Sequence, residues 1–510
     1  MHRIACIITS LILLSSLQVY SRSFFVSSIN GDNSRNGLSA ENAWADLSNV
    51  HWGSFLPGDS IKFECGSTFE GSCFIVSAGS SSQPIVFTSY GQGVLPQFRN
   101  SGEWSNCLEV RGDQNAAYII IEKLHLAGSE EAGVNIRHGA HHVIIQDCEI
   151  SNTGFGVYLG GPYNLVTRNN IHDLKMIRNT LGTSSPENDD DYGACAVVIN
   201  ESHNTVSNNT MLNCRAPSYD YQHDGGAVEF FGNVDSCTVA YNYASGCDGF
   251  LEVGGGDMTG NRIHHNMAFN NWNGFAYIHL TGLYGAQISD MRIENNTIVC
   301  LKQDKSYALV LGIGGTASDS MLFFRNNVVY ARMNFTNSSS FNRSHNIFSM
   351  VEGASIGTSL KEGEITSDPL FADLAGGDPH LTSASPAIDA GMDCGYTYDF
   401  DGNPPSGQID IGAFEFRPTG TPLQKQKVKV EGIRSKIHKE CLLVSGVSFL
   451  SKLDAVVTDL SGKILFRGPM IQSNGKWITP RFQTTPNTIL LYRLSGPDFI
   501  SHGRAFNGKK

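Results

Sequence analysis

The sequence predicts an all-β protein: a long parallel β-helix, a solenoid, followed by a small β-sandwich. Three observations support this. A chain of 510 residues is too long for one ordinary core unless its fold grows by repetition along an axis. Short strand-like runs repeat at intervals of twenty-odd residues through the middle of the chain. An Asp or Asn also recurs at the same point of eight of these runs.

The recurring Asp or Asn sets the coil length. Its shortest spacings are 20 to 24 residues, which suits one coil of a β-helix, and longer spacings indicate loops inserted at a corner. Asn tolerates left-handed backbone, and its side-chain amide can bond its equivalent on the next coil, so we expect one continuous ladder. The registered residues are Asp147, Asn169, Asn209, Asn242, Asn266, Asn296, Asn326 and Asn346.

The two ends of the solenoid resemble a known group. Residues 22–113 contain FFVSSINGDNSRNGLSAENAW, LPGDSIKFECGSTFEG and QPIVFTSYGQG, short alternating strands separated by Gly, Asn and Pro turns. They resemble the N-terminal cap and first strands of exported bacterial right-handed parallel β-helix proteins of the carbohydrate-active type. The stretch SPAIDAGMDCGYTYDFDGNPPSGQIDIGAFEF (385–416) resembles the closing segment of that group. The resemblance therefore implies a right-handed parallel β-helix over residues 114–416.

The closing segment is acidic. Its hard oxygen ligands could hold a structural Ca²⁺, and we expect no other cofactor or metal. The alternative, which we favour, is an Asp/Asn/Gly turn with capping carboxylates. The residues concerned are Asp399, Asp401, Asn403 and Asp410.

The chain begins with a predicted export signal. Residues 1–21 combine a basic start with an apolar run from Ile4 to Leu17 and small residues near Ser21, which is typical of a secretory signal peptide. The run is shorter than the roughly 18 residues that span a bilayer. We therefore expect a secreted or cell-surface attached protein without a membrane span.

The C-terminal part differs in composition. Residues 417–430 predict a linker, and residues 431–510 alternate as short strands, most distinctly in VVTDLSGKILFRG (456–468). This part resembles the C-terminal sorting domain of type IX secretion in Bacteroidetes; the alternative is an accessory β-sandwich that binds glycan or caps the solenoid. From residue 425 on there are 15 Lys and Arg against 5 Asp and Glu, in a chain of net charge −12. The body is thus acidic, and we expect a monomer that binds no nucleic acid.

Cysteine usage argues against a disulfide framework. Eleven of the 12 cysteines remain once the signal peptide is removed, an odd number. Cys65 and Cys73 are close enough in sequence to pair. Cysteines inside strand-like runs, such as Cys148 and Cys195, are expected to be buried thiols.

The candidate chemistry lies in residues 219–280. YDYQHDGGAVEFFG, DGFLEVGGG and NGFAYIHL repeat, and their alternation places apolar residues such as Val228 and Leu251 in the lumen. The outward residues are then Ala227, Glu229, Phe231, Asp248, Phe250, Glu252, Asn273, Phe275, Tyr277 and His279. Continued along the solenoid, the row through Glu229 reads Asn135, Tyr158, Val198, Glu229, Glu252, Tyr277 and Val310.

Glu229 and Glu252 are the principal catalytic candidates. Carboxylates about 4.8 Å apart repel, and one of them acquires a raised pKa. That spacing is close to the roughly 5–5.5 Å of a retaining glycosidase, in which one carboxylate is the nucleophile and the other the acid and base. The sequence does not distinguish the two roles. Asp224 and Asp248 are further candidate catalytic carboxylates; the alternative is that both Glu are solvated or hold a cation.

Two insertions lead into the Glu229 strand. Residues 174–193 and 213–224 are expected to wall a groove, since loops over an ordered sheet concentrate binding residues. The acidic run Asp189–Asp191 is more typical of a solvated turn than of a substrate or metal site. The candidate substrate-binding residues are Tyr219, Tyr221, His223, Trp272, Tyr277 and His279.

These features predict a secreted glycoside hydrolase acting on a polysaccharide or oligosaccharide. A polysaccharide lyase of the same fold is one alternative, but it needs a base and a cation for the uronate, and the coils from Asp224 to His279 offer only Arg262. The acidic body would also repel a polyanion. A non-catalytic glycan-binding surface protein is the other alternative, because the aromatic loops would serve it equally well.

Overall fold

The computed structural model describes residues 21–181, 190–303 and 308–417, and strand backbones between residues 434 and 507. These residues divide into two compact units. One runs to Leu370 and includes Ala384–Glu415; the other comprises Phe371–Ser383 and the chain from Phe416 on. The predicted signal peptide and almost all of the predicted linker lie outside the described residues. Among the described residues, no helix has the length and apolarity needed to cross a membrane.

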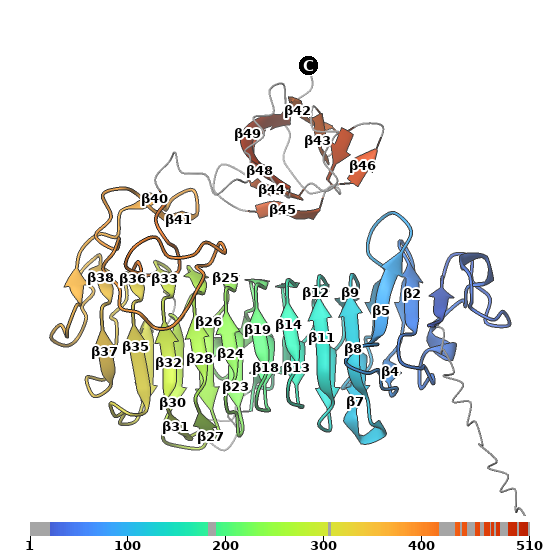
Figure 1. Cartoon of the computed structure of the whole chain (residues 1–510), viewed down its shortest axis with the longest axis horizontal. Coiled ribbons are helices and arrows are strands. Elements are labelled where there is room, and N and C mark those ends of the chain that lie inside the picture. The colour runs from blue at the N-terminus through green and yellow to red at the C-terminus, as the bar shows by residue number, and fades with distance from the viewer. Residues whose placement is uncertain are drawn as a thin grey trace, which may run out of the picture. The chain divides into compact units, whose positions relative to one another are not determined.

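The first unit is a parallel β-helix. Successive coils contribute one strand to each of three parallel sheets, and the strands stand side by side in chain order from blue to yellow in Figure 1. Sheet 1 consists of β1 (Ser23–Val26), β2 (Ser60–Glu64), β5 (Ile85–Tyr90), β8 (Ala117–Glu122), β11 (His141–Gln146), β14 (Leu165–Thr167), β19 (Thr205–Ser207), β24 (Thr238–Ala240), β28 (Arg262–His264), β32 (Met291–Glu294), β35 (Leu322–Arg325) and β37 (Asn342–Ser344).

Sheets 2 and 3 complete each coil. Sheet 2 consists of β3 (Thr68–Glu70), β6 (Gln97–Arg99), β9 (His125–Ala127), β12 (Glu149–Ser151), β15 (Asn170–His172), β20 (Thr210–Leu212), β25 (Tyr243–Ser245), β29 (Met267–Phe269), β33 (Thr297–Cys300), β36 (Val328–Ala331), β38 (Ile347–Met350) and β39 (Ile365–Thr366). Sheet 3 consists of β4 (Cys73–Ile75), β7 (Asn106–Arg111), β10 (Ala132–Arg137), β13 (Phe155–Leu159), β18 (Cys195–Ile199), β23 (Gly226–Phe231), β26 (Gly249–Gly254), β30 (Ala276–His279) and β34 (Leu311–Gly314).

Short elements decorate the coils. Two insertions form antiparallel hairpins before sheet 3 strands, and one parallel pair follows sheet 3. These are β16 (Met176–Arg178) with β17 (Tyr192–Gly193), β21 (Ala216–Ser218) with β22 (Gln222–Asp224), and β27 (Gly256–Thr259) with β31 (Ala286–Ser289). Three 3-10 turns are described, η1 (Ala40–Asn42), η2 (Leu47–Asn49) and η3 (Gly112–Gln114).

The predicted ladder is present, with two members displaced by one residue. Asn242 donates its side-chain amide to Asn266 Oδ1 at 3.0 Å, and the same bond recurs along the column at 3.0–3.2 Å. Asn327, not Asn326, occupies its coil, and Cys148, not Asp147, precedes Asn169. The column therefore reads Cys148, Asn169, Asn209, Asn242, Asn266, Asn296, Asn327 and Asn346.

The displacement has a conformational cause. At this corner of the coils the left-handed residue is the one that precedes the ladder, as at Asp147, Tyr241, His265 and Asn326, with φ between 49° and 58°. The ladder is thus selected for its amide hydrogen bonds and not for tolerance of left-handed backbone. Where Asp or Asn fills both neighbouring positions, as at Asn326 and Asn327, the sequence pattern does not separate the two roles.

The lumen is apolar, and alternation predicted most of it. Val228 and Leu251 are at most 2% exposed, as expected. Ala227, Phe250 and Phe275 were expected to face outward, and this is wrong: all three are 0% exposed. The rings of Phe250 and Phe275 stack inside with centroids 4.9 Å apart. Two successive residues of each coil are buried here, because the strands are irregular at this point. The pairing skips Ala227 and Phe250 between Gly226–Gly249 and Val228–Leu251, and the backbone N–H groups of Phe250 and Leu251 both donate to Phe275 O. Such an irregularity interrupts strict alternation.

The closing segment packs along the flank of the solenoid. Gly412 donates its backbone N–H to Asn326 O, and the Tyr396 ring stacks on His264 with centroids 4.1 Å apart. Asp399 accepts backbone N–H groups from Asp401, Asn403 and Glu415, as a turn-capping carboxylate does. Asp410 accepts the Asp389 N–H. A structural Ca²⁺ stays a prediction.

The predicted Cys65–Cys73 disulfide is wrong. Both cysteines are free; Cys73 is buried in the lumen on β4, and Cys65 follows β2 in another sheet. Cysteines predicted as buried thiols, including Cys148 and Cys195, are buried and free.

The second unit is described mainly by its backbone. It contains the hairpin β40 (Phe371–Asp373) with β41 (Asp378–Leu381) and two four-stranded antiparallel sheets. Its β44–β45 hairpin pairs Val456 with Arg467, as expected for residues 456–468. The sheets are β42 (Arg434–His438), β43 (Cys441–Ser445), β47 (Lys476–Ile478) and β46 (Ile471–Ser473), and β45 (Ile464–Pro469), β44 (Asp454–Thr458), β48 (Thr488–Gly496) and β49 (Phe499–Asn507).

Candidate active site

The outward row of sheet 3 carries the two Glu residues side by side. Glu229 on β23 is in register with Glu252 on β26, and Val198 and Tyr277 flank the pair on β18 and β30. Parallel neighbours lie about 4.8 Å apart, so the two carboxylates project from adjacent coils on the same face. The N-terminal members Asn135 and Tyr158 also fall in this row. The row continues to a further carboxylate, Glu109, on β7.

The prediction that Val310 is the last member of the row is wrong. Gly312 pairs with Tyr277, whereas Val310 is fully buried just before β34. The Tyr277 ring lies over Gly312: a Cβ there would come within 2.5 Å of Tyr277 Cδ2. Glycine leaves room for the ring in this position, and Tyr277 is 42% exposed.

Glu229 has a shielded environment. Its side chain is half-buried, and the Cys195 thiol donates a hydrogen bond to Glu229 Oε2 at 3.3 Å. Burial, followed by the charge of Glu252, raises the pKa of Glu229 to about 7. The thiol hydrogen bond and His279 oppose this rise, but only partly. Glu229 is thus poised between its acid and its base form near neutral pH.

Glu252 has an open environment. Its side chain is 46% exposed, and its Oε1 lies 2.9 Å from Nε2 of His279 on the next coil. With Nε2 protonated, His279 donates this hydrogen bond and stabilises the carboxylate form. The Tyr277 ring packs beside His279, with centroids 4.6 Å apart at 61°. Tyr277 and His279 therefore adjoin the pair, as expected.

Asp224 and Asp248 differ sharply. Asp224 ends β22 half-buried, and burial, then the charges of Glu252, Asp248 and Glu229, raises its pKa well above the usual range. Asp248 is buried in an ion pair with Arg215, with Oδ1 and Nε 3.0 Å apart, and accepts the Asn273 amide at 2.6 Å. Asp224 therefore adds a carboxyl whose protonated form is favoured by its surroundings, whereas Asp248 is committed to a structural pair.

Trp272 belongs with that pair. Its half-buried ring is contacted by the Arg215 guanidinium at 4.8 Å and the Lys302 ammonium at 4.9 Å. Two cations thus already contact the ring that was expected to stack on a sugar.

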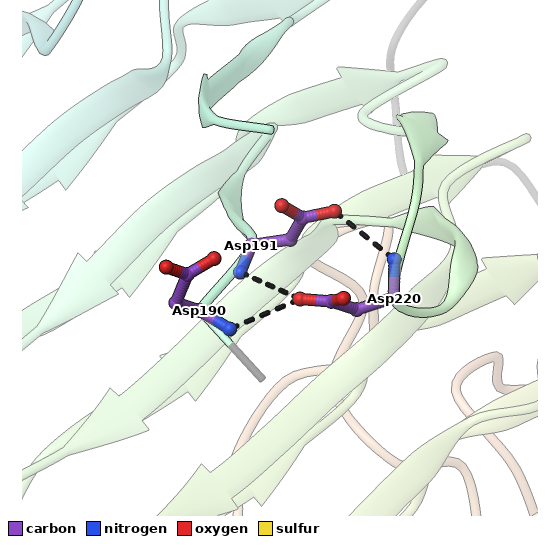
Figure 2. Close-up of side chains that lie close together, drawn as sticks. All are labelled: Asp190, Asp191 and Asp220. Atoms are coloured by element: carbon purple, nitrogen blue, oxygen red, sulfur yellow. Dashed lines mark hydrogen bonds between the residues drawn. The ribbon is translucent and has the colours of Figure 1, made fainter. Parts of the chain in front are cut away.

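The remaining predicted binding residues lie on the β21–β22 hairpin. Tyr219, at its tip, is 59% exposed, while Tyr221 and His223 are half-buried. The hairpin is joined to β16–β17 by three carboxylates, shown in Figure 2. Asp220 accepts the backbone N–H groups of Asp190 and Asp191, and Asp191 in turn accepts the Asp220 N–H at 3.1 Å.

The three carboxylates of Figure 2 lie close enough to hold a cation. Their oxygens are, however, engaged by the two loops: Asp191 also accepts from Ser218 and Tyr219, and Asp190 pairs with Arg178. The run is therefore a cross-link between the insertions. Asp189, and residues 182–189 generally, lie outside the described residues.

Two contributors were not expected from the sequence. Cys195 was assigned only to burial, and Arg215 was not considered, yet they contact Glu229 and Asp248. Cys195 precedes the row position of β18 by three residues, and Arg215 lies in an insertion. No periodic signal marks either contact.

Comparison with known proteins agrees with this architecture. Residues 106–298 match a family model described as a right handed beta helix region. Pectate lyase Pel9A is similar in structure, with a TM-score of 0.53 and 17% identity over 78% of this chain and 97% of that one. GH136 lacto-N-biosidase from Eubacterium ramulus has a TM-score of 0.42 and 13% identity, and the match covers 68% of this chain and 67% of that one. XylC in complex with xylose has a TM-score of 0.48 and 10% identity, and the match covers 78% of this chain and 98% of that one.

No curated protein matches the sequence significantly. At these identities the structural likeness is one of fold. Together with the three parallel sheets and the family model, it establishes that the first unit of this chain is a right-handed parallel β-helix.

Proposed function

We propose that this protein is a polysaccharide-active glycoside hydrolase that uses Glu252 as nucleophile and Glu229 as general acid and base. The observation that carries the proposal is the register of Glu229 with Glu252 on adjacent coils in unlike environments. Their strand spacing suits the carboxyl separation of a retaining enzyme. The predicted signal peptide would place this activity outside the cell.

The environments suggest which carboxylate has which role. A general acid needs a pKa near the working pH, and that of Glu229 is raised to about 7. A nucleophile must be ionised and reachable, and Glu252 is exposed and hydrogen-bonded by His279. Unlike environments around two neighbouring carboxyls are the pattern that separates the acid from the nucleophile.

The two half-reactions follow. Glu252 attacks the anomeric carbon while protonated Glu229 gives its proton to the glycosidic oxygen, and the C–O bond to the leaving sugar breaks. A glycosyl ester on Glu252 results. Glu229, now ionised, takes a proton from water, the water oxygen bonds to the anomeric carbon, and the ester bond breaks. Both carboxyls return to their starting states.

Asp224, in its protonated form, would supply a hydrogen-bond donor beside the pair, and the exposed Tyr277 ring a surface for a sugar. Pectate lyase Pel9A, whose name gives a polysaccharide substrate, shares the fold and so supports a glycan substrate but not a reaction type. A lyase is less well supported, because Arg215, a cation in the insertion that leads into β23, is paired with Asp248.

The test is a panel of neutral and acidic polysaccharides incubated with wild type, Glu229→Gln and Glu252→Gln. Reducing ends and the absorbance of unsaturated uronates are followed together. We expect reducing ends without unsaturated products, and loss in both variants. Glu149→Gln is the matched control, since Glu149 also lies beside a histidine, His172, on an outer face, but in sheet 2. Unsaturated products would indicate a lyase, and binding without turnover a glycan-binding protein.

A further inference from the structure

We propose that Cys195 is a positioning residue for Glu229: its thiol donates to Oε2 and so leaves the transferable proton on Oε1. The hydrogen bond is part of the structure, and the catalytic role assigned to it rests on the function proposed above. The site would then use an uncharged, weak donor to orient its acid, where a cation would hold that acid ionised.

The contact is built by two neighbouring coils. Cys195 begins β18 and pairs with Gly226, the first residue of β23, three positions before Glu229. Its side chain is nearly buried at 5% exposed, and its Sγ lies 3.3 Å from Glu229 Oε2. This is the hydrogen bond that the described residues give to the Glu229 carboxyl. Because Oε2 accepts it, Oε1 is the oxygen left to carry a proton toward substrate.

The thiol keeps its proton under all working conditions. Burial, then the charges of Glu229, Asp224 and Glu252, raises the pKa of Cys195 well above its usual value. Cys195 is therefore a donor whichever state Glu229 adopts, and it adds no negative charge to an already acidic site. The charged or titratable groups around Glu229 are Cys195 from β18, Asp224 from β22, Glu252 from β26, His279 from β30 and Tyr158 from β13.

The experiment titrates Glu229 itself, without substrate. The infrared band of its protonated carboxyl, identified by its loss in Glu229→Gln, is followed against pH in wild type, Cys195→Ala and Cys195→Ser. A thiol that donates stabilises the carboxylate, so removing it in Cys195→Ala should raise the midpoint by about 0.5–1. The better donor in Cys195→Ser should lower it. Cys148→Ala, which removes a buried thiol far along the column, should leave it unchanged.

The sign of the shift decides the matter. A lower midpoint in Cys195→Ala would mean that the sulfur accepts a proton from Glu229, and an unchanged midpoint in both variants would mean that the contact is only packing; either overturns the proposal. If Cys195→Ala fails to fold, Cys195→Ser alone gives the answer. Once a substrate is identified, the alkaline limb of kcat/KM should move with the infrared midpoint. The titration stands even if the panel finds no hydrolysis, so the two proposals fail separately.

Discussion

The Asn ladder and the Glu229–Glu252 pair are both stacks of like side chains one coil apart, but they behave oppositely. An amide both donates and accepts, so each Asn in the ladder satisfies its neighbour, and the stack runs unbroken through seven buried residues at 3.0–3.2 Å. An ionised carboxylate only accepts, so a stack of two already repels. The Glu stack ends after two coils, at Val198 and Tyr277.

The difference separates a device for stability from a device for chemistry. The ladder repeats because repetition lowers its energy. The pair exists although repetition raises its energy, and the structure relieves the repulsion by keeping Glu229 partly protonated and Glu252 hydrogen-bonded. A stack of two like charges that persists on adjacent coils therefore marks a functional site better than burial or exposure alone.

The largest effect should come from removing the nucleophile. Glu252→Ala should lose activity by about 10³-fold or more, and azide should restore part of it as a glycosyl azide, because a small anion fits the vacated space. Glu229→Ala should lose activity by about 10²–10⁴-fold, and the loss should be smaller with substrates whose leaving groups need no proton. Product analysis by mass spectrometry and NMR separates them. Azide can also attack the glycosyl ester that still forms in Glu229→Ala, so the anomeric configuration decides. An inverted glycosyl azide is expected from Glu252→Ala and a retained one from Glu229→Ala, and the opposite result would reverse the assignment.

The ladder should be broken by one truncation. Asn266→Ala removes the acceptor of the Asn242 side chain and backbone and the donor to Asn296, leaving buried polar groups unpaired. We expect a loss of about 2–4 kcal/mol in the free energy of unfolding, measured by urea denaturation. The exposed Asn49→Ala should cost less than about 0.5 kcal/mol. Equal losses in the two variants would show that the ladder adds nothing.

The pair should instead become more stable when its charge is removed, in a pH-dependent way. The pKa of Glu229 is about 7 in the fold against 4.5 for the ordinary group, so the folded state binds its proton more tightly. Relative to Glu229→Gln, wild type should therefore lose stability as pH rises from 4.5 to 7, by on the order of 2 kcal/mol. Thermal melts across this range give the difference. Parallel curves for the two proteins would contradict the raised pKa.

Acid should act on another part of the solenoid. Burial lowers the pKa of His264 and His265 to about 3, below the ordinary 6.5, so the unfolded chain binds these protons more readily. Stability should fall as pH drops below 6.5 and continue to fall toward 3. His265→Asn removes one of these imidazoles and suits the left-handed backbone at this position. It should reduce the loss of stability at acid pH and leave unchanged the stability difference between wild type and Glu229→Gln.

The smallest effect should be at Gly312. Gly312→Ala places a Cβ against the Tyr277 ring, which is exposed enough to rotate away, so we expect about 1 kcal/mol or less in stability. If Tyr277 binds sugar, KM should rise while kcat changes little. Gly282→Ala, where a Cβ would meet no atom within 4 Å but φ is +85°, controls for backbone strain alone.

The coil period, the apolar lumen and the pairing of Glu229 with Glu252 could all be predicted from the sequence. These features are encoded locally: alternation within a strand sets which side chains face out, and equal coil lengths set which strands are neighbours. Errors arose where neither rule applies. One is the irregular pairing that buries Phe250, and the other follows the insertion that precedes β34, where the expected row had Val310 in place of Gly312.

The groups that surround the pair could not be predicted in this way, because they depend on the folded arrangement of several coils. Cys195, His279 and Asp224 reach Glu229 and Glu252 from three further strands, one of them in an inserted hairpin. Such contacts depend on side-chain direction and on how loops of unequal length close, and neither is periodic in sequence. The raised pKa of Glu229 arises from burial and from the neighbouring charge of Glu252, so it is a property of the folded site and not of the Glu residue alone.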